Sequence, residues 1–423
     1  MLLASLCFVL HPTPAACEDP LDRKQQEAIV VEYLALDRYS REARARGLEL
    51  LKSLDEVPFP NRRELKRWDS FFAKQAKSLP RLPLKAGEYF DIDDASGRYF
   101  LAGQMKRPKA LFVGLHGGGV GSGDASSSRG MYEQALSERG WLGVFPEVLE
   151  KTELGWTTSG TEEWVLSLID RALVTFDIDS NHVFLGGHSM GGYGSWVVGA
   201  DHADRFSALL PSAGAPSFVQ NRSRGTIRVQ SGVIPNLRNT PMCVFQSTDD
   251  PKVGPEANQA AVRDLKTAKD RWGGYEHFEY WEVDDRGHGL PAAGVGALLE
   301  KIEGYVRQPA PSYIVWQPRV DWKEQFHWLL WEGGAEVRGT IVAQVDRARG
   351  TIDVRLERTQ GKGLCVLLSD ALVDMQDEVT VFANGVKVFE GVPQPDFATW
   401  VRGRALGDPG RAFDVRIPLT LAD

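Results

Sequence analysis

The chain has 423 residues, of which 43% are hydrophobic, and its formal net charge is −8 at pH 7. This length exceeds one typical domain, and the apolar fraction is ample for large cores. The negative charge is mild, and no basic cluster or aromatic platform is present, which argues against a nucleic-acid partner.

The first segment, residues 1–18, has the features of a secretory signal. Residues 1–10 are mostly apolar, and small residues and Cys17 follow them. No basic residue precedes the apolar run, and Cys17 matches a lipid-attachment signal poorly because Pro14 stands where leucine is usual. The run is too short to span a membrane. We therefore expect a secreted or periplasmic protein without a membrane span.

Residues 19–85 predict a helical arm. Charged residues, leucine and alanine dominate this stretch, and apolar residues such as Val30 and Leu34 recur at partial helical spacing. Pro58 and Pro60 interrupt the pattern. We expect the arm to pack on the domain that follows it.

A buried-strand run at residues 110–115 leads into a glycine-rich loop, His116-Gly-Gly-Gly. Such a loop leaves backbone N–H groups exposed, as an oxyanion hole requires. We assign one donor to Gly118, with Gly119 as the alternative, and a plain glycine-rich loop is the competing interpretation. His116 is expected to order the loop rather than to act as a base.

A second loop, residues 146–164, follows the strand-like run 141–145 and is expected at the same edge of the sheet. Trp156 in this loop is a candidate contact for an acyl group or a sugar. A loop tryptophan packed on a neighbouring segment accounts for it equally well.

The most informative stretch is residues 183–192, which read Val-Phe-Leu-Gly-Gly-His-Ser-Met-Gly-Gly. A serine nucleophile must stand clear of its own backbone, and a sharp strand-to-helix turn provides that exposure. The turn crowds the residues two before and two after Ser189, so only glycine fits, as at Gly187 and Gly191.

Helical spacing of apolar residues follows the serine. The N–H groups of this helix start point at the turn, so we assign the second oxyanion donor to Met190. His188, next to the serine, is a candidate substrate contact.

In the glycine-rich loop after residues 110–115 and in the turn around Ser189, the chain resembles the α/β-hydrolase superfamily. It resembles the smaller secreted esterases of this superfamily, with likeness to the catalytic domains of polyhydroxybutyrate depolymerases, dienelactone hydrolases and prolyl oligopeptidases, over roughly residues 88–306. The resemblance implies a mostly parallel sheet with helices on both faces, and a triad in the chain order serine, acid, histidine. We place this domain at residues 86–308.

The resemblance also implies that the acid lies in the turn after a strand, ahead of a proline and a valine. Residues 242–245 form such a strand-like run, and both Asp249 and Asp250 follow it. The match to Asp-Pro-x-Val favours Asp250, and a solvated turn is the competing interpretation.

Three histidines follow the serine within this region. His202 stands too near the end of the nucleophile helix to return to the cleft, and His277 begins an alternating, strand-like run. His288 lies just beyond that run in a glycine-flanked loop, where open α/β sheets collect their catalytic groups. We therefore predict His288 as the base.

These residues predict a serine esterase that uses neither metal nor cofactor, since the histidines and cysteines lack ligand spacing. We expect a small-molecule ester substrate with a short or sugar-linked acyl group. Fewer than about 90 residues precede the sheet, too few for several propeller blades of about 40 residues. A prolyl-oligopeptidase-like peptidase is thus the alternative, and a catalytically silent binding scaffold is another.

A Gln-Pro-Ala-Pro linker opens the last part, residues 309–423, where short strand-like runs recur. Asn384-Gly385 predicts a hairpin turn. We expect a β-sandwich-like module, which resembles the β-rich tails of many secreted bacterial hydrolases. It serves either as a packing platform for the hydrolase domain or in attachment to carbohydrate or cell wall, and the sequence leaves both roles open. Cys243 and Cys365 are expected to be buried free thiols.

Overall fold

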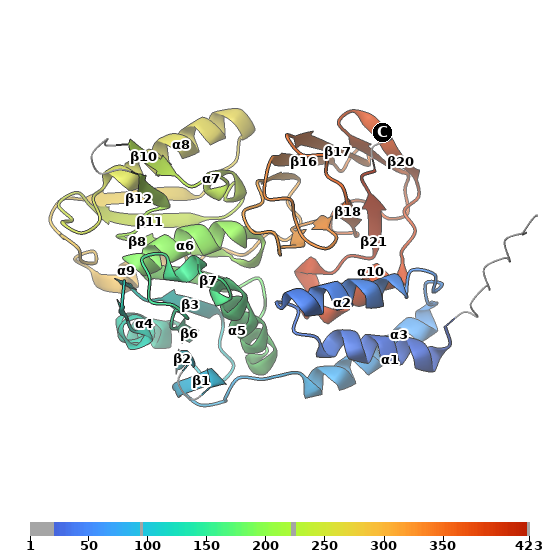
Figure 1. Ribbon diagram of the computed structural model, residues 1–423, viewed down its shortest axis with the longest axis horizontal. Coiled ribbons are helices and arrows are strands. Elements are labelled where there is room, and N and C mark those ends of the chain that lie inside the picture. Colours follow the sequence, from blue (N-terminus) through green and yellow to red (C-terminus); the bar gives the residue numbers. More distant parts are fainter. Residues whose placement is uncertain (1–20, 94–95, 221–225, 421–423) are drawn as a thin grey trace, which may run out of the picture.

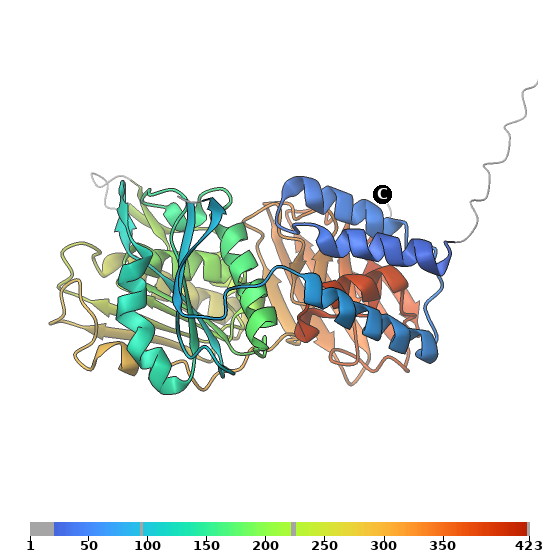
Figure 2. The same ribbon diagram turned by 90° about the horizontal axis from the view of Figure 1, so that it is seen from below.

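The computed structural model describes residues 21–93, 96–220 and 226–420 of the chain (Figure 1). The predicted signal segment, including Cys17, lies outside these residues. A central α/β domain occupies one half of the molecule, and the N-terminal helices and the C-terminal β-sheets together occupy the other half (Figures 1 and 2).

An eight-stranded sheet forms the centre of the α/β domain, in the order β1-β2-β6-β3-β7-β8-β11-β12. The two pairs that involve β2 are antiparallel, and the other pairs are parallel. The bounds are β1 Gly87–Asp93, β2 Ser96–Gly103, β3 Leu111–Leu115, β6 Leu142–Pro146, β7 Val183–His188, β8 Ala208–Ser212, β11 Met242–Ser247 and β12 Phe278–Val283.

Helices cover both faces of this sheet, as Figure 2 shows. Alternate residues of each inner strand enter different cores: Leu111 and Val113 of β3 face one cluster, and Phe112 faces the other. α5 (Thr161–Phe176), α6 (Met190–Asp201) and α8 (Glu256–Trp272) cover the first face, and α4 (Ala125–Arg139) and α9 (Gly294–Glu300) cover the second. The expected α/β architecture is confirmed.

The N-terminal arm consists of α1 (Arg23–Ala35), α2 (Arg41–Lys52) and α3 (Arg62–Gln75). Asp22 and Asn61 each form a capping box at a helix start. The arm contacts the α/β domain, as expected, since the Tyr39 hydroxyl donates to Asp170 of α5 at 2.5 Å, but most of its apolar side packs on a different element. Its apolar side forms a separate core with the C-terminal helix α10 (Phe397–Ala405), which lies next to α2 in Figure 1. In this core Trp68 of α3 packs on Phe397.

The C-terminal part contains two β-sheets, in the orders β13-β16-β17-β19-β20 and β14-β15-β18-β21. Asn384 and Gly385, both with positive φ, form the predicted hairpin turn between β19 and β20. Cys243 and Cys365 are free and buried, as expected. The strands are β13 Tyr313–Trp316, β14 Gln325–Phe326, β15 Leu329–Trp331, β16 Thr340–Asp346, β17 Thr351–Glu357, β18 Leu364–Leu368, β19 Val379–Ala383, β20 Val386–Gly391 and β21 Val415–Pro418.

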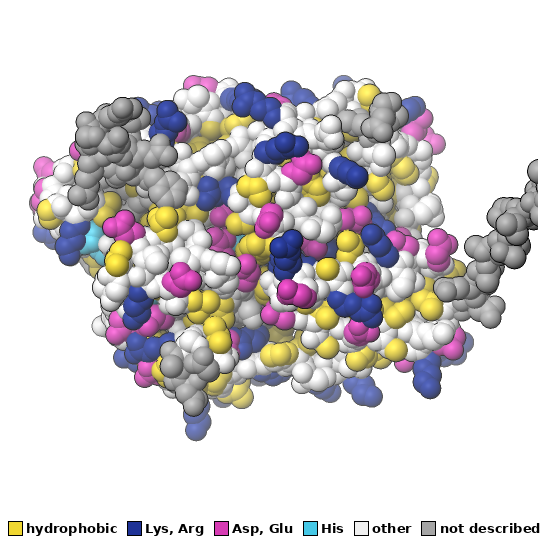
Figure 3. All heavy atoms as spheres, viewed as in Figure 1, with side chains coloured by type: hydrophobic (Ala, Val, Ile, Leu, Met, Phe, Trp, Pro, Cys, Tyr) yellow, Lys and Arg dark blue, Asp and Glu magenta, His cyan; other side chains and the backbone are white. Residues whose placement is uncertain are grey.

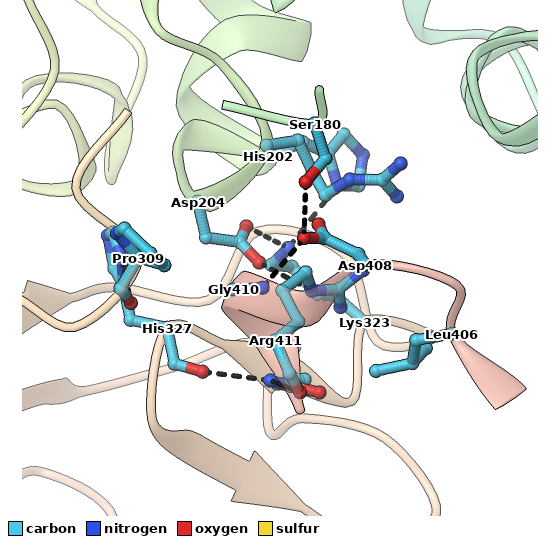
Figure 4. Close-up of polar contacts among 12 residues, drawn as sticks. Ser180, His202, Asp204, Pro309, Lys323, His327, Leu406, Asp408, Gly410 and Arg411 are labelled. Carbon is cyan, nitrogen blue, oxygen red and sulfur yellow. Dashed lines mark hydrogen bonds and ion pairs between the residues drawn. The ribbon is translucent and has the colours of Figure 1, made fainter. Parts of the chain in front are cut away.

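A buried group of charged side chains joins the C-terminal part to the α/β domain (Figure 4). The Arg307 guanidinium donates two hydrogen bonds to Asp408, of 2.6 and 2.7 Å, and both side chains are at most 3% exposed. Ser180 Oγ donates to the same carboxylate. Burial alone would raise the pKa of Asp408, but the Arg307 hydrogen bonds and charge outweigh it and hold the pKa below its usual value.

Two short hairpins and one helix complete the carboxyl edge of the main sheet. β4 (Gly118–Gly119) pairs with β5 (Ser122–Gly123), and β9 (Ser217–Gln220) pairs with β10 (Thr226–Val229), ahead of α7 (Val233–Asn236). On the face that Figure 3 shows, acidic and basic side chains are interspersed. Within the described ranges, no helix combines the length and apolar character that a membrane crossing needs.

Candidate active site

Ser189 occupies the sharp turn between β7 and α6. Its φ of 60° and ψ of −120° are rarely adopted by residues with a side chain, and such strain is typical of functional sites. The neighbours explain the two glycines. A Cβ added to Gly191 would lie 2.1 Å from the Leu115 carbonyl oxygen, and one added to Gly187 would lie 2.6 Å from the backbone of Gly191. The turn therefore closes only with glycine at both positions.

Asp250 and His288 meet at the same edge of the sheet, from the loops that follow β11 and β12. His288 Nδ1 lies 2.7 Å from Asp250 Oδ2, and the Asp250 side chain is fully buried. The other carboxylate oxygen, Oδ1, accepts the backbone N–H groups of Lys252 (2.8 Å) and Val253 (3.0 Å). The carboxylate thus receives a proton donor on both oxygens, so His288 carries its proton on Nδ1 and leaves Nε2 able to accept one.

The His288 ring lies against the residue that precedes the nucleophile. Its centroid is 4.9 Å from that of His188, whose Nδ1 is 3.1 Å from Ser212 Oγ. Burial and the nearby His288 lower the pKa of His188 to about 4, so His188 is neutral at pH 7. His188 is thus held beside the predicted base, and its contact with a substrate stays a prediction.

Asp249 does not contact His288 but holds the loop that carries it. Its Oδ1 accepts the Ser247 hydroxyl (2.5 Å) and the Gly287 N–H (2.8 Å), and Ser247 Oγ in turn accepts the N–H of Arg286 (3.0 Å). From the sequence, Asp249 is only an alternative acid, and its role in holding the loop was not predicted. The Ser-x-Asp pattern at the end of β11 is a signal for it, since such side chains commonly bond nearby backbone groups.

The glycine-rich loop lies directly against the nucleophile. A Cβ added to Gly117 would lie 3.2 Å from Ser189 Cβ and 3.1 Å from the His188 carbonyl oxygen. His116 orders this loop, because Nδ1 lies 2.8 Å from the Gly117 carbonyl oxygen and Nε2 accepts the Val148 N–H at 3.1 Å. Burial lowers the pKa of His116, which keeps it neutral in this role.

Trp156 is fully buried beneath the glycine-rich loop. Its indole N–H donates to the His116 carbonyl oxygen at 3.2 Å, and its ring packs against Gly194 of α6. A side chain with no exposed surface cannot contact a substrate in this arrangement. The substrate-contact interpretation of Trp156 is therefore wrong, and the packed loop tryptophan is the correct alternative.

The two other candidate histidines lie elsewhere. His202 ends α6, where it is buried with Nε2 3.1 Å from a Glu162 carboxylate oxygen. His277 precedes β12 and packs on Tyr305 with ring centroids 5.0 Å apart. Of the three histidines considered from the sequence, His288 is the one that bonds a carboxylate beside the Ser189 turn. Among the described residues, no three His, Cys, Asp or Glu side chains are grouped to hold a metal ion.

Comparisons with known proteins give matches only at the level of structure. No family model matches the chain, and no curated protein does. A thermostable esterase is similar over 53% of this chain and 63% of its own, less than two thirds, with 21% identity and a TM-score of 0.39. Est1E from Butyrivibrio proteoclasticus matches over 52% and 96%, with 14% identity and a TM-score of 0.37. The poly(3-hydroxybutyrate) depolymerase LpqC from Bordetella parapertussis matches over 48% and 85%, with 19% identity and a TM-score of 0.36.

Proposed function

We propose that this protein is a serine hydrolase that cleaves carboxylic esters with short or sugar-linked acyl groups through an acyl-enzyme on Ser189. One observation carries the proposal: the buried Asp250 carboxylate fixes the tautomer of His288 at 2.7 Å, and the His288 ring lies against the strained turn that presents Ser189. A neutral imidazole held in this tautomer is a proton acceptor for a serine hydroxyl.

The chemistry follows from these roles. As Ser189 Oγ attacks the ester carbonyl carbon, its proton passes to His288 Nε2, and the carbonyl oxygen becomes an oxyanion. Asp250 stabilises the resulting imidazolium. When the C–O bond to the alcohol breaks, His288 returns the proton to the leaving oxygen, and the acyl group remains on Ser189. Water then repeats the sequence, with His288 as base, and releases the acid.

We assign the oxyanion donors to the N–H groups of Gly118 and Met190. Met190 is the first residue of α6, so its N–H has no acceptor within the helix. Gly119 pairs with Ser122 across a two-residue turn. In such hairpins the residues next to the turn exchange hydrogen bonds and the following pair does not, which favours Gly118 over Gly119 as the free donor.

The elements around the site support an ester substrate over a peptide. The described residues before β1 form helices, with none of the repeated four-stranded blades that a propeller would need. In its described residues, the inserted segment between β8 and β11 carries one small hairpin and the short helix α7, rather than a long apolar lid. These features favour small, soluble esters.

Covalent labelling with a fluorophosphonate tests the proposal without knowledge of the substrate. We expect labelling of the wild type and of Ser127→Ala, a serine change at an exposed position of α4, but none of Ser189→Ala. Folded wild-type protein that never labels would favour the silent scaffold and overturn the proposal.

A substrate panel then tests the specificity. We expect turnover of short-chain p-nitrophenyl esters or acylated sugars. Preference for long-chain lipids or proline-containing peptides would contradict the ester assignment as we state it.

A further inference from the structure

A cavity of about 120 Å³ lies where the arm, the α/β domain and the C-terminal part meet. The arm lines one side, mainly with residues of α1 and α2. The α/β domain lines another side with residues of α5 and the end of α6, and the C-terminal part lines the rest, including the segment 322–325 and α10. None of the residues of the Ser189 site lines it. A buried water needs roughly 10–15 Å³. The cavity is therefore large enough for a small organic molecule.

One part of the lining is aliphatic. Seven leucines line the cavity, and none of them bears a polar group: Leu34, Leu36, Leu48, Leu51, Leu166, Leu330 and Leu406. An apolar chain placed along this part would be removed from water, which is favourable.

The other part of the lining is strongly basic. Eight cationic side chains line the cavity, and only two of the lining residues, Glu324 and Glu332, are acidic: the cations are Arg38, Arg44, Lys52, Arg205, Lys323, Arg402, Arg411 and Arg416. Three carboxylates that do not line the cavity form ion pairs with these cations: Asp55, Asp170 and Asp204. Five carboxylates therefore accompany eight cations, of which Lys52 is exposed to solvent, and this leaves a local excess of positive charge.

The excess is concentrated at identifiable groups. Lys323 and Arg411 share the single carboxylate of Asp204, at 2.7 and 3.5 Å (Figure 4). The Lys323 side chain is only 6% exposed, and burial lowers its pKa to about 8 despite Asp204. The Arg44 guanidinium lies over the ring of Trp322 and donates a hydrogen bond to the Tyr39 carbonyl oxygen. Among the described residues, no carboxylate lies within ion-pair distance of it.

We propose that this cavity binds a small amphiphilic carboxylate. Its carboxylate would pair with Arg44 and the Lys323 side of the cavity, and its aliphatic chain would lie along the leucines. A bound anion would supply the negative charge that the lining lacks, since burying cations without partners is unfavourable. Inorganic phosphate would use only the charged part, and a neutral alcohol only the apolar part. The proposal does not depend on activity at Ser189.

Isothermal titration of the full-length protein with octanoate tests this site. We expect one binding site whose affinity falls at least about tenfold in Arg44→Gln, because the unpaired cation is removed. Arg46→Gln is the matched control on the same helix: Arg46 is half-exposed, pairs with Glu32 and Glu49, and does not line the cavity. Its affinity should equal that of the wild type. Octanol and inorganic phosphate should both bind more weakly than octanoate.

A second variant protects the test against misfolding. Ala43→Leu, also on α2, narrows the cavity without changing charge and should weaken octanoate binding as well. Absence of octanoate binding at millimolar concentration would overturn the proposal, as would affinity unchanged by both variants. Octanol or phosphate binding as tightly as octanoate would also overturn it. None of these readouts uses Ser189, so they stand even if the protein fails to label with a fluorophosphonate.

Discussion

Replacement of Asp250 by asparagine should abolish activity by changing the tautomer of His288. Oδ1 of Asp250 accepts two backbone N–H groups, from Lys252 and Val253, at 2.8 and 3.0 Å. In Asp250→Asn the amide oxygen must keep this position, because an NH₂ group there would face two donors. The amide NH₂ then faces His288 Nδ1, 2.7 Å away, and Nδ1 must become the acceptor. The proton moves to Nε2, which can no longer accept the proton of Ser189.

The expected loss is large because it removes the base altogether. A triad whose acid becomes an amide loses about 10⁴-fold in kcat. At about 1.36 kcal/mol per tenfold, this corresponds to about 5 kcal/mol of transition-state stabilisation. The measurements are kcat on a short p-nitrophenyl ester and the rate of fluorophosphonate labelling, with circular dichroism to show that the variant is folded.

Asp249→Asn is the matched control. Asp249 uses one oxygen to accept the Ser247 hydroxyl and the Gly287 N–H, and an asparagine carbonyl can accept both. We expect a loss of no more than about tenfold, since only charge-assisted strength is lost at an exposed position. If Asp249→Asn loses as much activity as Asp250→Asn, or if Asp250→Asn retains a tenth of wild-type kcat, our assignment of the acid is wrong.

Two further changes test the turn and the joint between the domains. Gly191→Ala should prevent the Ser189 turn from closing, because the new Cβ would lie 2.1 Å from the Leu115 carbonyl oxygen. We expect a loss of soluble yield or of fluorophosphonate labelling. Gly130→Ala on α4 is the control and should be tolerated, because its new Cβ would have no atom within 4 Å. Asp408→Ala should lower the free energy of unfolding by about 3–5 kcal/mol in denaturant titration at pH 7, because it leaves Arg307 buried without its carboxylate. The pKa of Asp408 is lower in the folded protein than in the unfolded chain, where it is about 3.9. The stabilisation by Asp408 is therefore complete above the unfolded pKa and is lost as the pH falls through the folded pKa. The wild type and the variant should thus converge in stability at acid pH. A wild-type advantage that persists unchanged at acid pH would contradict this account, as would normal labelling of Gly191→Ala.

Features that depend on neighbouring residues were predictable from the sequence. The turn around Ser189 needs glycine two residues away on each side, and this steric requirement is visible in the chain itself. The Asn384-Gly385 hairpin also follows from local backbone preference. The inner strands of the α/β domain, β3, β6, β7, β8 and β11, are short apolar runs because both faces of the sheet are covered there. His288 could be predicted because only three histidines follow the serine in that domain.

Features that depend on packing between distant segments were decided only by the tertiary structure. Asp249 and Asp250 are adjacent and occupy the same turn. The Asp-Pro-x-Val match favoured Asp250 as the acid, but the bond from Gly287 to Asp249 depends on where the loop after β12 lies, which only the tertiary structure decides. The exposure of Trp156 depends on the loop that folds over it. The same limit applies to the arm: an amphipathic helix shows in its sequence that it must bury an apolar face, but not that its partner is α10, some 350 residues away along the chain. Helical spacing is a property of neighbours, whereas contacts between elements depend on how the whole chain minimises its exposed apolar surface and pairs its buried charges.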